Sequence, residues 1–187
     1  MGTTGVIAVV VGVVLLGALI WAVRTFNRLV ALRNQTGASW AQVEVQLERR
    51  HDLVPNLVAT VERYAAHERG TLEAVTAARG AAVAGRAGTA ARAKAENELT
   101  AKLGGLFALA EGYPELAAAE SFRQLQAELA RTEDKIAYAR QFYNSAVQSY
   151  NTAQETFPGT LFAGGHTRKE YFEAETGARE TVRVRFA

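Results

Sequence analysis

The chain has no cysteine among its 187 residues, and only three prolines and three histidines. The absence of cysteine excludes disulfides, thiolate catalysis, thiolate metal sites and the acylated cysteine of a lipoprotein. Lysine and arginine nearly balance aspartate and glutamate, which leaves a net charge of +2. This charge lacks the strong basic footprint of a nucleic-acid-binding protein, so we expect no nucleic-acid partner. The scarcity of proline favours long helices.

A long apolar run is the most informative feature that is present. Residues 6–23 read VIAVVVGVVLLGALIWAV, and no charged residue precedes Arg24. At about 1.5 Å per residue this run forms a helix of about 27 Å, close to a bilayer core of about 30 Å. Because residues 1–5 carry no lysine or arginine, an uncleaved anchor is favoured over a secretory signal peptide. We therefore predict a transmembrane anchor over residues 1–23.

The residues that flank this run indicate an orientation. Trp21 lies where an amphipathic ring meets the headgroups, and Arg24, Arg28 and Arg33 follow on the C-terminal side. The positive-inside rule then predicts a single-pass protein of the bacterial inner membrane, with its short N-terminus outside and its C-terminal domain in the cytoplasm. Membrane lipids are the expected partners of this segment.

Beyond the anchor, apolar residues recur in steps of three and four, which is typical of amphipathic helices. We expect the first soluble helix to continue from the anchor, either directly or after a short break near residues 33–37. Pro55 either kinks this helix or ends it, with a restart capped by Asp52, and we favour the kink. Gly85 and Gly88 predict a turn between two antiparallel helices, the second of which ends before Pro114.

The clearest helix begins near Phe122 and continues to about Phe157, with apolar residues at a 3.5-residue period. This period predicts coiled-coil-like antiparallel packing. We predict an all-α fold: a transmembrane helix, an antiparallel bundle of long helices over residues 24–160 and a short extended C-terminal segment over residues 161–187. The last residues, TVRVRF, indicate a strand or an extended arm. Two Tyr-Asn pairs, at residues 143–144 and 150–151, are expected to pack inward and form hydrogen bonds across helices; the alternative is that the tyrosines dock a partner.

One polar cluster is a candidate interaction site, which we call the polar notch. It consists of Arg49, Arg50, His51, Asp52 and Asn56. A kinked helix would expose carbonyl groups beside these side chains and so build a binding site, whereas the alternative is an ordinary solvated helix face.

The sequence shows no set of residues that predicts catalysis. His67 and Glu68 resemble the start of a zinc-protease motif, but Thr71 stands where the second histidine is needed. We therefore expect no metal site, no cofactor, no catalytic residues and no enzymatic activity.

Several strings in the chain resemble the LemA family of bacterial membrane proteins. The resemblance extends from Asn27 to Tyr171 and is carried by LVALRNQTGASWAQVEVQLERRHDLVPNLVATVERYAAHE, AENELT, LFALAEGYPELAA, FRQLQAELARTEDKIAYARQFYNSAVQSYN and FPGTLFA. It implies an N-terminal membrane helix followed by a cytoplasmic helical bundle. It implies no enzymatic reaction and supplies no catalytic residues. It also suggests a partner role beside a membrane-bound metalloprotease, in envelope or stress settings.

Three functions follow as hypotheses. The first is a membrane-anchored scaffold or adaptor that forms homo-oligomers or presents helical faces to a membrane protease or another membrane protein, in envelope stress or membrane protein quality control. The second is a small-ligand sensor or enzyme that uses the polar notch. The third is lipid binding or membrane shaping by the basic residues after the anchor.

Overall fold

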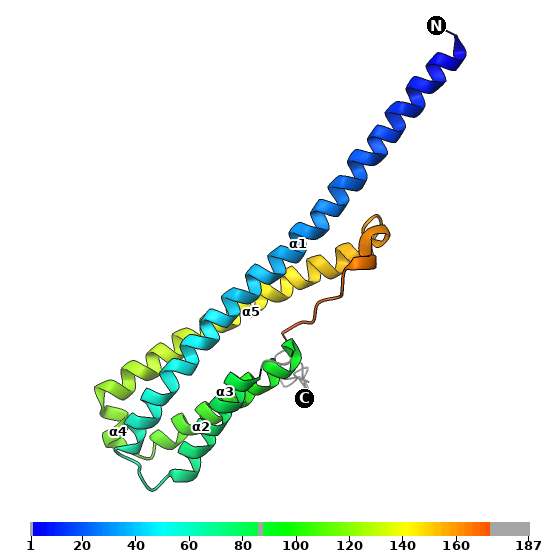
Figure 1. Ribbon diagram of the computed structural model, residues 1–187. Helices are drawn as coiled ribbons and strands as arrows, with labels where there is room; N and C mark the ends of the chain where they lie inside the picture. The colour runs from blue at the N-terminus through cyan, green and yellow to red at the C-terminus, as the bar shows by residue number, and fades with distance from the viewer. Residues whose placement is uncertain (1, 86–87, 173–187) are drawn as a thin grey trace, which may run out of the picture.

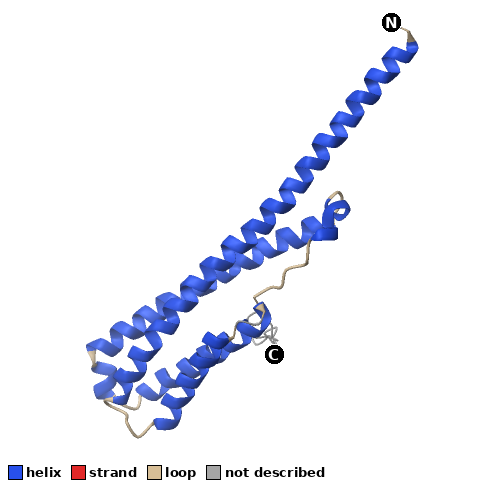
Figure 2. Cartoon of the chain, in the orientation of Figure 1, coloured by secondary structure: helices blue, strands red, loops and turns tan. Residues whose placement is uncertain are grey.

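The computed structural model describes residues 2–85 and 88–172, and these residues form an all-helical fold (Figure 1). Its elements are α1 (Thr3–Glu62), α2 (Arg69–Ala84), α3 (Thr89–Ala110), α4 (Pro114–Ala118), α5 (Glu120–Glu155) and the 3₁₀ helix η1 (Gly159–Gly165). Figure 2 shows no strand in this part of the chain. The predicted all-α fold with long helices is confirmed.

Helix α1 is a single helix of 60 residues, about 90 Å long. Its N-terminal part projects beyond the other helices, and its apolar side chains up to Val23 are exposed or only partly covered (Figure 1). Its C-terminal part lies in the bundle and buries Leu47, Leu57 and Val61. The apolar run therefore continues directly into the first soluble helix, without the break near residues 33–37. The helix also continues through Pro55, so it does not restart at Asp52.

Helix α5 lies antiparallel to α1, and the α2–α3 pair packs against these two helices (Figure 1). The periodic residues of α5 that were expected to form a seam, including Leu129, Ile136, Tyr143 and Tyr150, are buried. One apolar cluster lies where α2, α3 and α4 meet α1 and the N-terminal part of α5, and a second joins α1 and α5 around Val43 and Ile136. The antiparallel arrangement predicted from the 3.5-residue period is confirmed.

Glycine and proline set the chain reversals as expected. Helix α2 ends at Ala84 and α3 begins at Thr89, and Gly88 just before α3 has a φ of +79°, which favours glycine. Helix α3 ends before Gly112, and Pro114 begins the short helix α4. This five-residue helix was not predicted, because it is too short to show a helical period.

The chain turns sharply after α5. A Cβ atom at Gly159 would lie 1.7 Å from the carbonyl oxygen of Ala153, so this position has room only for glycine. The 3₁₀ helix η1 follows, and its residues 161–165 belong to the segment that was predicted to be extended. Extended backbone begins at His166 and continues to Phe172. The TVRVRF segment lies outside the described residues.

Two asparagines of α5 bind the main chain of this extended segment. Asn151 donates its Nδ2 hydrogen to the Lys169 carbonyl at 2.9 Å, and its Oδ1 accepts from the Lys169 amide at 3.0 Å. Asn144 makes the same two bonds with Phe172, at 3.1 and 2.9 Å. The seven-residue step from Asn144 to Asn151 advances about 10.5 Å along the helix, and the three-residue step from Lys169 to Phe172 advances about 10 Å along an extended chain, so the two spacings match. We call Asn144 and Asn151 the asparagine pair.

The tyrosines beside the asparagine pair pack inward, as predicted. Tyr143 and Tyr150 are buried. The Tyr143 hydroxyl donates to the Glu170 carbonyl at 2.9 Å, and the Tyr150 hydroxyl lies 3.1 Å from His166 Nδ1. Both Tyr-Asn pairs therefore hold the extended segment against α5. Their hydrogen bonds were expected to run across helices, but the partners lie in residues 166–172, outside the helices.

Replacing Asn151 with alanine should release the extended segment around Lys169. The substitution removes two hydrogen bonds, worth about 1 to 3 kcal/mol together, and local opening should raise the rate of tryptic cleavage after Lys169 about fivefold or more. Ser145→Ala is the control, because the Ser145 hydroxyl bonds within α5 to the Gln141 carbonyl. Equal cleavage rates in the two variants would contradict the assignment.

Candidate functional site

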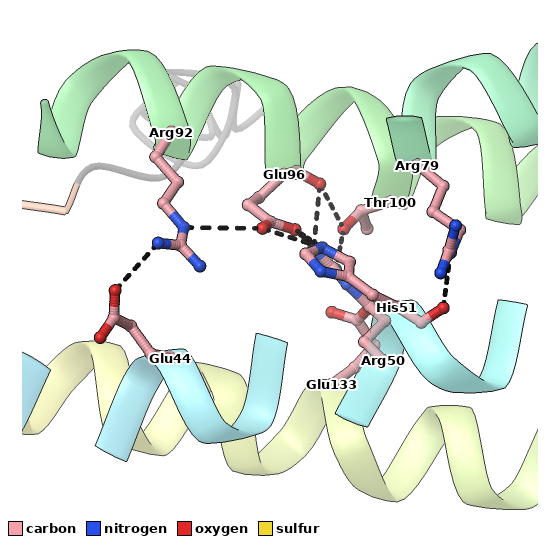
Figure 3. A network of polar contacts seen from close by, with 8 residues as sticks. All are labelled: Glu44, Arg50, His51, Arg79, Arg92, Glu96, Thr100 and Glu133. Carbon is pink, nitrogen blue, oxygen red and sulfur yellow. Dashed lines mark hydrogen bonds and ion pairs between the residues drawn. The ribbon is translucent and has the colours of Figure 1, made fainter. Parts of the chain in front are cut away.

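The site begins at Pro55, inside helix α1. Proline has no N–H group, so the His51 carbonyl four residues earlier lacks its usual helical donor. Arg79 of α2 supplies a donor instead, with its Nε 2.6 Å from the His51 carbonyl oxygen (Figure 3). The proline therefore creates a main-chain acceptor that joins α1 to α2, at the position where the sequence predicted exposed carbonyls.

Arg50 is the centre of a buried network of polar contacts. Its side chain is 1% exposed, and its Nη2 pairs with Glu96 Oε2 of α3. Its Nη1 lies 2.7 Å from Thr100 Oγ1 and 2.6 Å from Glu133 Oε1 of α5. A single guanidinium thus connects three helices, and its planar fork of donors suits several oxygen acceptors at once.

Glu96 is the buried anion of this network. His51 Nε2 lies 3.2 Å from its Oε2, and Arg92 Nε lies 4.0 Å from its Oε1 (Figure 3). Burial raises the pKa of the Glu96 carboxyl, but the hydrogen bond from His51 and the charge of Arg50 outweigh burial. The pKa of Glu96 is therefore lowered, and the carboxylate is charged at neutral pH.

Arg92 extends the network toward the surface. Its Nη1 lies 3.0 Å from Glu44 Oε1, and its guanidinium carbon lies 5.6 Å from the centre of the Trp40 ring. This placement combines an ion pair with a cation–π contact. Arg92 also lines a cleft of about 680 Å³ between α1 and the α2–α3 turn, together with His51, Asp52 and Arg79.

The structure divides the polar notch between two environments. Arg50 and His51 are buried, whereas Arg49, Asp52 and Asn56 are exposed. Of the exposed three, Asp52 reaches the cleft. The five residues therefore do not converge on one site, and the two buried ones bind neighbouring helices.

Sequence reasoning missed the partners of Arg50, which come from other helices. They are Glu96, Thr100 and Glu133, joined to the network by Arg79 and Arg92. One local signal was present for Glu96. It occupies a position in the apolar stripe of α3 between Ala93 and Leu99, where a charged residue predicts a buried partner.

The membrane-flanking residues lie along the part of α1 that enters the bundle. Trp21, Arg24, Arg28 and Arg33 are all exposed on α1. His67 is exposed as well, outside α1 and α2. Within residues 2–85 and 88–172 there is no group of three or more histidine, aspartate or glutamate side chains that could hold a metal ion.

Comparison with known proteins places this fold in a family. The sequence pattern of the LemA family matches residues 39–186. The chain belongs to the LemA family. Magnetosome proteins MamQ 1 and MamQ 2 of Paramagnetospirillum magneticum are each 27% identical to it over 175 residues. The MamQ protein of Magnetospirillum gryphiswaldense has the same identity. The match covers 79% of this chain and 64% of each relative.

The whole Arg50 network lies inside the matched LemA region. Glu44, Arg50, Arg79, Glu96 and Glu133 all fall within residues 39–186, whereas the apolar run precedes it. The region matched by the family therefore contains the buried charges that join the helices of the bundle. Helix α1, whose apolar run precedes the matched region, is a candidate membrane span by length and composition, and none of its most apolar stretch is buried.

Removing either charge of the buried pair should destabilise this LemA protein strongly. Arg50→Met or Glu96→Met leaves the partner charge buried without its main counter-ion, at a cost of about 3 to 5 kcal/mol in the free energy of unfolding. The double variant should cost less than the sum of the two, because neither charge then stays unpaired. Urea unfolding of the detergent-solubilised chain, followed by circular dichroism, measures these changes.

Arg49→Met is the matched control, because Arg49 precedes Arg50 but is exposed. It should change the free energy of unfolding by less than about 0.5 kcal/mol. An Arg50→Met variant as stable as this control would contradict the role of the network.

The lowered pKa of Glu96 predicts a specific pH dependence. A carboxyl group with a lowered folded-state pKa stabilises the fold above its unfolded-state pKa, about 4.3, and this contribution is lost as the pH falls through the folded-state value. The stability difference between wild type and Glu96→Gln should therefore be constant at higher pH and should shrink below about pH 4.3. Unfolding of both proteins across this range tests it; a difference independent of pH would contradict the shift.

Proposed function

We propose that this LemA protein is a membrane-anchored helical scaffold. The observation that carries the proposal is the continuity of α1, from an exposed apolar segment at Thr3 to the buried core residue Val61. A continuous helix has no flexible linker, so the bundle keeps a defined direction relative to the segment that enters the bilayer. Such a connection suits a protein that positions other molecules at a membrane.

One face of the bundle is suited to association. We call it the apolar groove: it lies between α1 and α5, has a volume of about 560 Å³ and is lined by Ala41, Val45, Tyr138 and Ala139 among others. Val45 is 60% exposed and Tyr138 is 72% exposed. Exposed aromatic and aliphatic side chains of this kind are enriched at protein interfaces. We propose that this face binds a second copy of the chain or, in an adaptor role, another membrane protein such as a membrane protease.

The proposed orientation follows from charge. Arg24, Arg28 and Arg33 are on the bundle side of the apolar run, so the bundle would lie in the cytoplasm of a bacterial cell and the short N-terminus outside the inner membrane.

A small-ligand sensor is the second candidate, and the cleft beside His51 and Asp52 is the feature that favours it. It has less support, because two of the residues that line the cleft already have partners: Arg92 pairs with Glu44, and His51 contacts Glu96. These internal pairs favour a structural role for the network. We propose no enzymatic reaction for the chain.

Cysteine cross-linking in native membranes tests the scaffold. The chain has no cysteine, so a Tyr138→Cys variant carries one reactive thiol at the apolar groove. A thiol-specific bifunctional reagent should give a cross-linked dimer, or a larger product whose second protein is identified by mass spectrometry. Glu73→Cys is the control, because Glu73 is exposed on α2, away from the groove. Recovery of Tyr138→Cys as monomer alone, like the control, would count against the scaffold.

A further inference from the structure

A second apolar surface lies at the end of the bundle where α1 emerges. Phe157 is 73% exposed and Leu161 is 65% exposed, and both belong to the segment around η1. Trp21 and Phe26 of α1 are also large and exposed. We call these four residues the interfacial patch. Single exposed apolar residues are ordinary, but a group of large ones gathered at one place marks a binding surface.

Contacts between rings join the two segments of the patch. The ring centres of Trp21 and Phe157 are 5.6 Å apart, and those of Phe26 and Phe162 are 6.4 Å apart. Figure 1 shows η1 beside the middle of α1, although the two are far apart in the sequence. Phe157 therefore lies at the level of Trp21, near the end of the apolar run at Val23.

The fold holds these exposed side chains in place. At the turn between Phe157 and η1, Gly159 lies so close to the Ala153 carbonyl that a side chain would not fit. Phe162 of η1 packs toward α1, whereas Leu161 beside it is exposed. Phe157 and Leu161 are thus exposed because the turn that carries them is held in this position by its contacts with α1 and α5.

The level of the patch along α1 identifies its partner. Trp and other amphipathic rings favour the boundary between acyl chains and headgroups, and Arg24 and Arg28 follow Trp21 by one and two helical turns. Among the residues that the structure describes, neither arginine forms an ion pair. Arg28 also lines a groove of about 490 Å³ between α1 and α5, beside Phe157. The apolar side chains of the patch suit the acyl chains of a bilayer, and the neighbouring arginines suit its phosphate headgroups.

We propose that the interfacial patch inserts into the bilayer interface, so that η1 forms a second membrane contact beside the span of α1. This inference rests on the proposed membrane anchor and adds to it. One helix alone leaves the bundle free to rotate about the helix axis. A second contact beside the first would fix which face of the bundle is turned to the bilayer, and would hold the end of α5 at the membrane surface.

Fluorescent labelling of single cysteines tests the insertion. An environment-sensitive label is attached to each of three single-cysteine variants of the full chain. They are Leu15→Cys in the span, Leu161→Cys in the interfacial patch and Tyr64→Cys after the end of α1. The chains are reconstituted in vesicles of phosphatidylcholine and phosphatidylglycerol that contain spin-labelled lipid. We expect quenched, blue-shifted emission at positions 15 and 161, and unquenched emission typical of water at position 64.

The outcomes separate the two proposals. Emission typical of water at position 161, with quenching at position 15, would overturn the second contact and leave the anchor standing. Blue-shifted emission without lipid quenching at position 161 would mean that protein, such as a second copy of the chain, covers the patch, and would also overturn it. Absence of quenching at position 15 would instead overturn the anchor itself.

A matched pair of variants tests which side chains are responsible. The label is placed on Thr160→Cys, because Thr160 is also exposed in η1. In this labelled chain, the double substitution Phe157→Ser and Leu161→Ser should cause a loss of lipid quenching. The control, Val45→Ser with Tyr138→Ser, removes two exposed apolar side chains from the apolar groove and should leave quenching unchanged. Circular dichroism should show the same helix content in both, because all four residues are exposed. Equal quenching in the two variants would contradict the role of Phe157 and Leu161.

Discussion

The buried ion pair between Arg50 and Glu96 is the interaction on which the bundle depends. Removing two charges from water costs several kcal/mol per ion, so the pair persists only where further groups compensate both charges. Thr100 and Glu133 accept hydrogen bonds from Arg50, and His51 lies within hydrogen-bond distance of Glu96. Because these groups come from α1, α3 and α5, they meet in only one alignment of the helices. We infer that the network selects this alignment, while the apolar clusters supply most of the burial.

Pro55 contributes to the same network without ending the helix that contains it. The carbonyl that proline leaves free, at His51, accepts a bond from Arg79 and so ties α2 to α1. A residue that commonly breaks helices thereby strengthens the packing around a continuous one. This continuity matters for the proposed function, since α1 is both the candidate membrane span and a central helix of the bundle.

The end of the bundle nearest the apolar segment is organised by different interactions. The asparagine pair binds main-chain groups of Lys169 and Phe172, so these bonds do not depend on which side chains the extended segment carries. The buried ring of Phe172 also packs against Trp40. Aromatic contacts then connect η1 to α1 at Trp21 and Phe26. The C-terminal segment and the long helix thus meet at the level proposed for the membrane surface.

The sequence by itself determined the features that depend on neighbouring residues. The apolar run, the periodic burial of α5 and the turn between Gly85 and Gly88 could all be predicted, because helical period and turn chemistry act over short distances. Tertiary structure alone decided the partners of Arg50, the donor to the His51 carbonyl, the residues held by the asparagine pair and the contact of Trp21 with Phe157. Each of these joins residues that are distant in the chain, and a pattern along one helix shows which side chain needs a partner but does not show which helix supplies it.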